Sequence, residues 1–148
     1  LHGRESPARV AELRARTGLQ VIKGVPVAGA TDIREARAFL GAADLMLFDG
    51  KAPKGAGLGL PGGNGLAFDW RLMAAAAWPG PWILSGGLDA GNVAEAVAAS
   101  GAHAVDVSSG VEDRPGVKNP DKIRAFLAAA RRRADVPAPG DIGVRAAR

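Results

Sequence analysis

The chain has 148 residues, of which 47% are hydrophobic and 23% are charged, a composition typical of one globular domain and unlike that of a disordered or fibrous chain. It contains no cysteine, which excludes disulfide bonds, thiolate metal sites and a cysteine nucleophile within these residues. No apolar run approaches the roughly 18 residues that span a bilayer, so we expect no membrane partner. Most of the formal net charge of +4 comes from the arginine-rich residues 131–148, and aromatic residues are few. We therefore expect no nucleic-acid partner.

Hydrophobic periodicity and capping residues predict helices and strands that alternate along the chain. After a strand end at residues 1–3, we expect helices over residues 7–17, 31–40, 68–77, 92–100 and 120–131, and strands over 20–27, 45–48, 82–84 and 104–107. Ser6 with Pro7, and Asn119 with Pro120, are typical of helix starts, and Asp32 and Asp69 are candidate caps of the second and third helices.

Repeated strand-helix units predict an α/β fold with a parallel sheet and helices on its faces. Two architectures fit this pattern. A doubly wound open sheet is accommodated by 148 residues, whereas a (β/α)₈ barrel needs about 200 to 250, so the chain would supply only part of a barrel. In both, the active site lies at the carboxyl ends of the strands.

Unusual residues follow the predicted strands at those ends. Two glycine-containing turns, Ser85-Gly86-Gly87 and Ser108-Ser109-Gly110, follow consecutive strands, and such turns let backbone N–H groups approach a phosphate. Asp49 ends the apolar strand over 45–48, where partial burial is expected to raise the carboxyl pKa toward the range of a general acid. Lys51 would oppose that shift if it came close. The long segment over 50–65 is interpreted as a lid.

These motifs resemble phosphoribosylanthranilate isomerase over residues 1 to about 131. The resemblance is carried by four ordered motifs, which are Leu47-Phe48-Asp49-Gly50-Lys51, Gly62-Gly63-Asn64-Gly65 before Phe68-Asp69-Trp70, Leu84-Ser85-Gly86-Gly87-Leu88, and Val105-Asp106-Val107-Ser108-Ser109-Gly110-Val111-Glu112. The last motif, followed by Pro115-Gly116-Val117-Lys118, is the most distinctive.

The resemblance implies a (β/α)₈ barrel that performs the Amadori rearrangement of N-(5-phosphoribosyl)anthranilate in tryptophan biosynthesis, in the cytoplasm and without a cofactor or metal. Asp49 then matches the general acid that protonates the ribose ring oxygen. The phosphate-binding turns are matched by Gly86 and Gly87 and by Ser108, Ser109 and Gly110, and the last-strand aspartate near the substrate by Asp106. His2 matches the histidine of the fourth strand, and His2 and Lys51 are further candidates for the site.

The departure from this family is large. The family's general base is a first-strand cysteine and a second-strand arginine helps to bind anthranilate, whereas this chain has no cysteine and no counterpart of strands one to three. We expect residues 1–134 to be the C-terminal part of the barrel, from the end of strand 4 through helix 8, and residues 135–148 to be a disordered tail. Such a chain would hold the acid and the phosphate site without the base, and would be inactive alone. Its open barrel edge invites self-association.

Two alternatives remain at this point. A flavodoxin-like module would bind a phosphorylated ligand without catalysis, and its strand-helix units are complete within 148 residues. Another phosphate-binding (β/α)₈ enzyme would share the glycine turns, although it would not account for Asp49 followed by Phe68-Asp69-Trp70.

Overall fold

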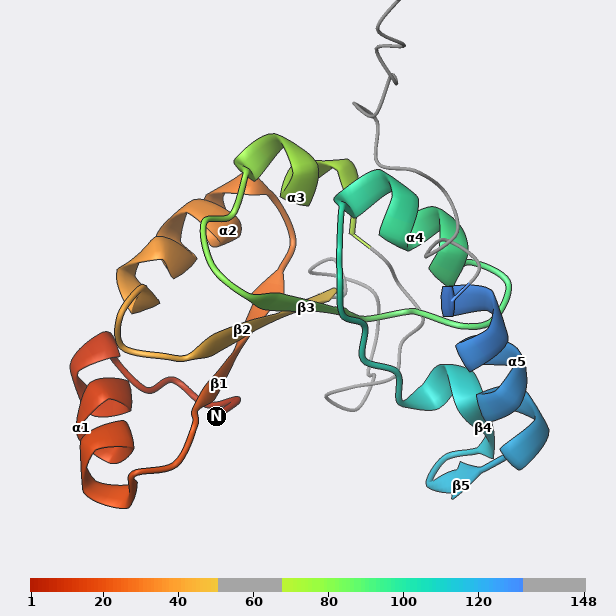
Figure 1. The fold of residues 1–148 in the computed structure, drawn as a ribbon, viewed down its shortest axis with the longest axis horizontal. Helices are drawn as coiled ribbons and strands as arrows, with labels where there is room; N and C mark the ends of the chain where they lie inside the picture. The colour runs from red at the N-terminus through yellow and green to blue at the C-terminus, as the bar shows by residue number, and fades with distance from the viewer. Residues whose placement is uncertain (51–67, 132–148) are drawn as a thin grey trace, which may run out of the picture.

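The computed structural model describes residues 1–50 and 68–131, and in this part of the chain the centre is a three-stranded parallel sheet (Figure 1). The strands stand in the order β1 (Ile22–Val27), β2 (Leu45–Gly50) and β3 (Trp82–Ser85). The α-helices are α1 (Pro7–Thr17), α2 (Ala30–Ala36), α3 (Arg71–Ala76), α4 (Val93–Ser100) and α5 (Pro120–Arg131). Short 3₁₀ helices η1 (Arg37–Phe39) and η2 (Ser109–Val111) and a hairpin of β4 (Glu112–Arg114) and β5 (Val117–Lys118) complete the described elements.

Two further segments extend the sheet at its edges, each through one residue, Leu1 on one side and Val105 on the other. The Leu1 amino group donates to the Ile22 carbonyl at 2.8 Å, and the Gly24 N–H donates to the Leu1 carbonyl at 2.8 Å. On the other side, Leu84 forms a parallel bridge with Val105. The predicted strand end at residues 1–3 therefore lies beside β1, and five segments follow one another across the sheet in chain order.

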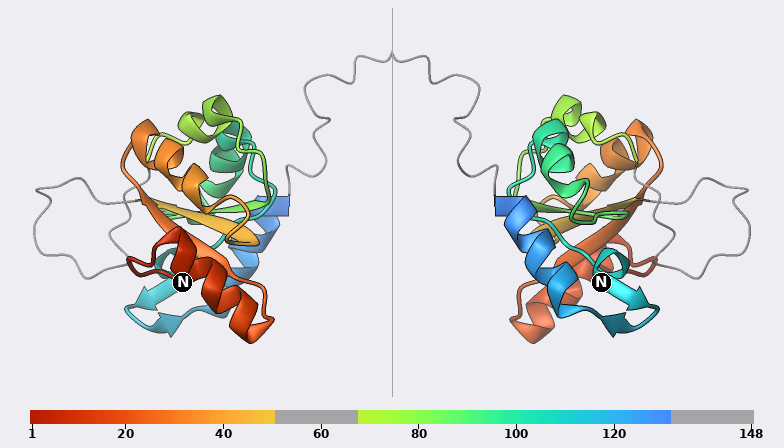
Figure 2. Two further views of the ribbon diagram at one scale, coloured as in Figure 1. Left: turned by 90° about the vertical axis from the view of Figure 1, so that its left-hand side faces the viewer. Right: turned by 90° about the vertical axis from the view of Figure 1, so that its right-hand side faces the viewer.

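The helices form an arc around one face of this sheet. In Figures 1 and 2, α2, α3 and α4 stand on the same face, while α1 and α5 continue the arc at its two ends. Along the arc α2 packs against α3, α3 against α4, and α4 against α5. The described strands follow one another in sequential order, and the helices cover one face of the sheet. A doubly wound sheet reverses its strand order and carries helices on both faces, so the flavodoxin-like alternative does not fit this arrangement.

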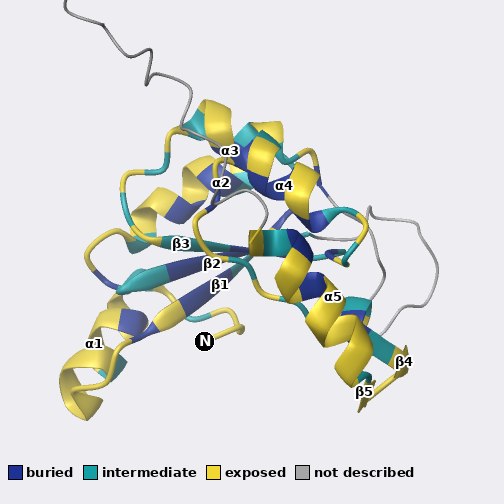
Figure 3. Ribbon diagram, turned by 45° about the vertical axis from the view of Figure 1, so that its right-hand side comes forward, coloured by how far each residue is buried: buried dark blue, intermediate teal, exposed yellow. Residues whose placement is uncertain are grey.

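The hydrophobic core lies between the sheet and the helical arc, where the buried positions of β2 and β3 face α2, α3 and α4 (Figure 3). Phe48 is fully buried, and its ring meets Trp78 and Trp82 edge to face, with centroids 5.0 and 5.9 Å apart. Because side chains alternate along a strand, the neighbours of Phe48 on β2, Leu47 and Asp49, point to the opposite face. Because Phe48 packs into the core, Leu47 and Asp49 line the face of the sheet that carries no helices.

Helix and strand positions are largely as predicted, and the helix ends show why. The Ser6 hydroxyl accepts from the Arg9 N–H at 3.2 Å, and Gly18 ends α1 with φ +66°. The Asn119 side chain accepts from the N–H groups of the first turn of α5. Asp32 acts from inside α2 rather than before it, accepting from the N–H groups of residues 28 and 29 at 2.7 and 3.0 Å.

Two local predictions are wrong, and one element was not predicted. The strand expected over 104–107 is reduced to the single Val105 bridge. The helix expected over 31–40 ends at Ala36 and continues as η1. The hairpin of β4 and β5 was not predicted, because residues 112–118 carry charges, a proline and a glycine rather than alternating apolar side chains.

Several predictions concern residues that the structure does not describe. They are the lid, apart from its first residue Gly50, the candidate site residue Lys51, the Gly62-Gly63-Asn64-Gly65 motif, and the tail over 135–148. Within the described ranges, no helix has the length and apolar character needed to cross a membrane.

Candidate active site

Strand register gathers three polar side chains on the sheet face that carries no helices. Asp49 of β2 pairs with Ser85 of β3, and Asp106 follows the bridged residue Val105 on the next segment. Because alternate side chains share a face, all three point away from the buried Phe48 and Leu84. The Ser85 hydroxyl donates to Asp106 Oδ2 at 3.2 Å, and Asp49 is the register partner of Ser85 in the sheet. Ser85 therefore lies between the two carboxylates.

The electrostatic surroundings of Asp49 favour its protonated form. Burial raises the pKa of Asp49 above its ordinary value, as the apolar strand predicted. The interactions of Asp49 with the Ser85 hydroxyl and with His2 lower this pKa, and the nearby Asp106 carboxylate raises it. The net effect is a raised pKa, which keeps more of the carboxyl protonated near neutral pH.

The turn at Gly86 and Gly87 lies directly against Asp49. Both glycines have positive φ, +93° and +65°. A Cβ added at Gly86 would lie 2.2 Å from the Gly50 nitrogen and 2.8 Å from Asp49 Oδ1. The Asn92 side chain donates to the Gly87 carbonyl at 2.8 Å and so ties this turn to the start of α4. Only a residue without a side chain allows this approach to the carboxylate.

The second glycine turn packs against the first. Ser108 and Ser109 are exposed, and η2 begins at Ser109. A Cβ added at Gly110 would lie 1.9 Å from the Leu88 carbonyl oxygen, immediately after the Gly86 turn. The two turns are therefore in contact, at the carboxyl ends of neighbouring strand positions, beside Asp49 and Asp106.

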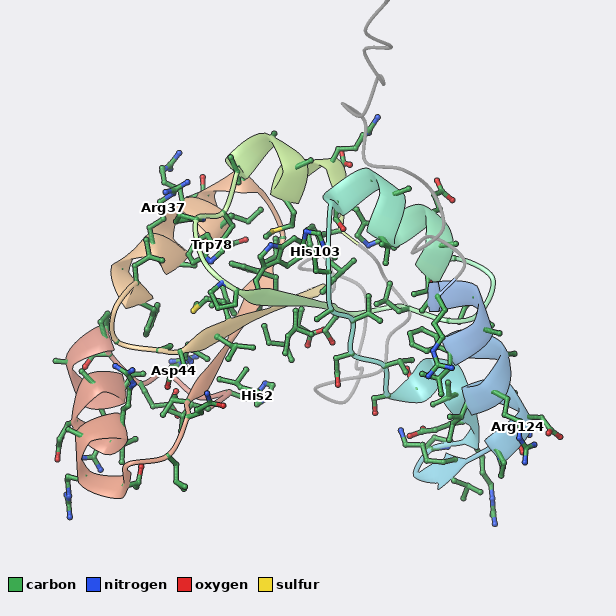
Figure 4. The ribbon with its side chains drawn as sticks, viewed as in Figure 1. His2, Arg37, Asp44, Trp78, His103 and Arg124 are labelled. Carbon is green, nitrogen blue, oxygen red and sulfur yellow. The ribbon has the colours of Figure 1, made fainter. Side chains whose placement is uncertain are left out.

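His2 lies at the edge of the same face. Figure 4 shows His2 on the side of the sheet away from α2, with Trp78 on the helical side. Its imidazole packs over Gly24 of β1, where an added Cβ would meet His2 Nδ1 at 2.6 Å. Residues 1–50 and 68–131 include no group of three His, Cys, Asp or Glu side chains that could hold a metal ion.

Sequence reasoning placed Ser85 in a turn and Asn92 at the start of a helix, without giving either a role at the site. Their side chains act across 21 and 5 residues respectively, Ser85 on Asp106 and Asn92 on Gly87. The first of these contacts depends on strand register, which no local pattern reveals. Lys118 also contacts the second turn, through the Ser108 carbonyl at 2.8 Å.

Comparisons with known proteins point to one family. Residues 1–129 match the family model described as N-(5'-phosphoribosyl)anthranilate (PRA) isomerase. The chain is 62% identical over 130 residues to N-(5'-phosphoribosyl)anthranilate isomerase of Rhodospirillum centenum, covering 88% of this chain and 60% of that protein. It is 59% identical over 131 residues to the protein of the same name in Cereibacter sphaeroides, covering 88% and 61%.

Solved structures agree with the sequence comparisons. Phosphoribosyl anthranilate isomerase from Thermotoga maritima superposes with a TM-score of 0.73 at 35% identity, covering 88% of this chain and 60% of that one. A phosphoribosyl anthranilate isomerase in complex with reduced 1-(o-carboxyphenylamino)-1-deoxyribulose 5-phosphate superposes with a TM-score of 0.70 at 32% identity, covering 88% and 57%. The chain thus spans about 60% of the length of the relatives it matches.

Proposed function

Because the chain belongs to the phosphoribosylanthranilate isomerase family, we propose that it carries the general acid and the phosphate site of that reaction. The reaction is the Amadori rearrangement of N-(5-phosphoribosyl)anthranilate to 1-(2-carboxyphenylamino)-1-deoxyribulose 5-phosphate, in cytoplasmic tryptophan biosynthesis. One observation carries the proposal: Asp49, with a raised pKa, lies against two interlocked glycine turns at the carboxyl ends of the strands.

In this proposal Asp49 protonates the ribose ring oxygen, so that the C–O bond breaks and the ring opens to an iminium ion. A general acid must hold its proton near the working pH and lie within reach of the leaving oxygen. The raised pKa of Asp49 supports the first requirement. Ser85 supports the second, because it stands opposite Asp49 in the sheet, is held by its hydrogen bond to Asp106, and so limits the positions that the Asp49 carboxyl takes. Asp106 and His2 border the substrate.

The phosphate is assigned to the two glycine turns. Positive φ at Gly86 and Gly87 and the absence of a side chain at Gly110 bring backbone close to any ligand above the strands. Exposed Ser108 and Ser109 add hydroxyl and N–H donors at the same place. Such convergent neutral donors suit an anion that must be released as product.

We assign residues 1–134 to part of a (β/α)₈ barrel, running from the end of its fourth strand through its eighth helix. Sequential strand order, a one-sided helical arc and the coverage of about 60% of each relative support this assignment. The chain has no cysteine, so the family's cysteine base does not come from it, and we expect no turnover by the chain alone. In the part of the chain that the structure describes, neither edge of the sheet is closed, which supports self-association through an edge.

Ligand binding tests the proposal without requiring turnover. We expect the chain to bind reduced 1-(o-carboxyphenylamino)-1-deoxyribulose 5-phosphate in calorimetric titrations, and to bind the same compound without its phosphate at least about tenfold more weakly. Ribulose 5-phosphate binding of equal strength would instead favour another phosphate-binding (β/α)₈ enzyme. No binding of the reduced compound would refute the proposal. Light scattering on the same samples measures self-association, and a monomer at every concentration would contradict that part.

Turnover tests the roles of acid and base. The chain is fused to the part of the Rhodospirillum centenum relative that it does not cover, and kcat is measured for the fusion and for its Asp49→Asn variant. We expect kcat of the variant to fall by about 10² to 10⁴, the usual contribution of a general acid. Asp121→Asn, at an exposed helix position, is the matched control and should keep normal turnover. Near-normal turnover by Asp49→Asn would show that Asp49 is not the general acid. Normal turnover by the unfused chain would refute the statement that this chain lacks the general base.

A further inference from the structure

Lys118 of β5 reaches back over ten residues to the second glycine turn. Its ammonium donates to the Ser108 carbonyl at 2.8 Å and to the Ser108 hydroxyl at 3.2 Å. A third bond runs to Glu112 Oε1 at 2.8 Å. An ammonium group has three N–H donors, and these contacts use all of them. Lys118 is therefore built into the turn and has no donor left for a ligand.

The bond to the Ser108 hydroxyl decides what that hydroxyl can do. A serine hydroxyl has one hydrogen, and it rotates freely unless a partner orients it. Because Lys118 occupies an acceptor position on Ser108 Oγ, the hydroxyl hydrogen is directed elsewhere, and Ser108 is exposed. The hydroxyl hydrogen therefore points away from Lys118 and is available to donate to an anion.

Glu112 anchors the lysine from the other side. The Glu112 side chain is largely buried, with 13% of its surface exposed, and its second oxygen accepts from the Gly116 N–H at 3.1 Å. The hydrogen bond with Lys118 holds the pKa of Glu112 below its ordinary value, so the carboxylate stays charged at neutral pH. The contacts of Glu112 within the hairpin of β4 and β5 thus hold the Lys118 side chain in place beside Ser108.

We propose that Lys118 is a positioning residue for phosphate binding, which fixes the turn of Ser108, Ser109 and Gly110 and orients the Ser108 hydroxyl as a donor to a phosphate oxygen. This inference rests on the proposed function, because it takes that turn as the phosphate site. It assigns a role to the hairpin, whose motif Pro115-Gly116-Val117-Lys118 the reaction itself leaves unexplained.

Lys122, in the first turn of α5, contacts the same hairpin and provides a matched control. Its side chain is 46% exposed, against 45% for Lys118. Its ammonium donates to the Glu112 carbonyl at 2.6 Å and pairs with Asp113 at 3.0 Å, with no contact to Ser108 among its described bonds. Loss of Lys122 therefore weakens the hairpin without releasing the turn.

The test compares Lys118→Met, Lys118→Arg and Lys122→Met in the full chain. We expect Lys118→Met to weaken binding of the reduced phosphorylated product by about tenfold, the loss of one well-placed hydrogen bond to a charged group. Lys122→Met should stay within about twofold, and Lys118→Arg should restore part of the loss. Binding of the dephosphorylated compound should be equal in all variants. Equal losses in the two methionine variants, or an equal loss for the dephosphorylated compound, would overturn the positioning role.

A second readout needs no ligand. In ¹⁵N spectra of the free chain, Lys118→Met should shift the amide signals of Ser108, Ser109 and Gly110, and Lys122→Met should leave them in place. Unmoved signals in Lys118→Met would refute the inference. If the unsubstituted chain binds no phosphorylated compound, the proposed function fails, and these signals still decide whether Lys118 orders the turn.

Discussion

Substitution of Gly86 by alanine is expected to be far more costly than the same change at a second glycine of similar backbone conformation. Gly86 has φ +93° and Gly101 has φ +77°, so both substitutions force an L-residue into the left-handed region. The added Cβ meets the Gly50 backbone nitrogen at 2.2 Å in the first case, and no atom within 4 Å in the second. The pair of variants therefore separates the steric overlap from the backbone penalty.

The expected magnitudes follow from these two terms. The left-handed conformation costs a residue with a side chain about 1 to 2 kcal/mol, and this should be the whole effect of Gly101→Ala. Overpacking against a close-packed neighbour adds about 1 to 3 kcal/mol, so Gly86→Ala should lose roughly 2 to 5 kcal/mol in total. The backbone of Gly50 has little freedom to move, because it is paired with Val27 in the sheet.

Urea unfolding monitored by tryptophan fluorescence measures both variants, since Trp70, Trp78 and Trp82 all pack against the core. Losses that agree within about 0.5 kcal/mol would refute the close approach of Gly86 to β2, because such a difference lies within measurement error. Unfolding of Gly86→Ala at urea concentrations where Gly101→Ala stays folded would support the close approach of Gly86 to β2. The same overlap displaces Asp49, so Gly86→Ala should also weaken binding of the reduced product, and Gly101→Ala should not.

Two further predictions concern the core and the one deeply buried cation of the described residues. Phe48→Ala should cost about 3 to 5 kcal/mol in urea unfolding, since it removes a fully buried ring, whereas Leu127→Ala, at a side chain that is 44% exposed, should cost much less. Glu5→Gln should lower Tm at neutral pH, because Glu5 pairs with the buried Lys23 ammonium at 3.0 Å. Lys23 holds the pKa of Glu5 below its ordinary value, so this stabilisation is present above about pH 4.5 and is lost as the pH falls further. A Tm difference that stays constant from about pH 7 to about pH 3 would contradict this account.

The elements of the fold that depend on local chemistry were predictable. A serine before Pro7, an asparagine before Pro120 and a glycine after Thr17 set three helix ends, because caps satisfy backbone groups within a few residues. The apolar strand before Asp49 also predicted the direction of its pKa shift, since burial of that strand follows from its composition. In contrast, Val105 lies in a short apolar segment that forms only one bridge, and pattern alone does not show how long a strand pairs.

The sequence by itself determined which residue types stand at the carboxyl ends of the strands: an aspartate after an apolar run and two glycine turns. Only the tertiary structure decided which of them meet. Ser85 reaches Asp106 across 21 residues because strand register aligns them, and Lys118 reaches Ser108 because an unpredicted hairpin folds back. The physical reason is that capping and burial act over a few neighbouring residues, whereas these contacts are set by strand pairing and side-chain alternation between distant segments.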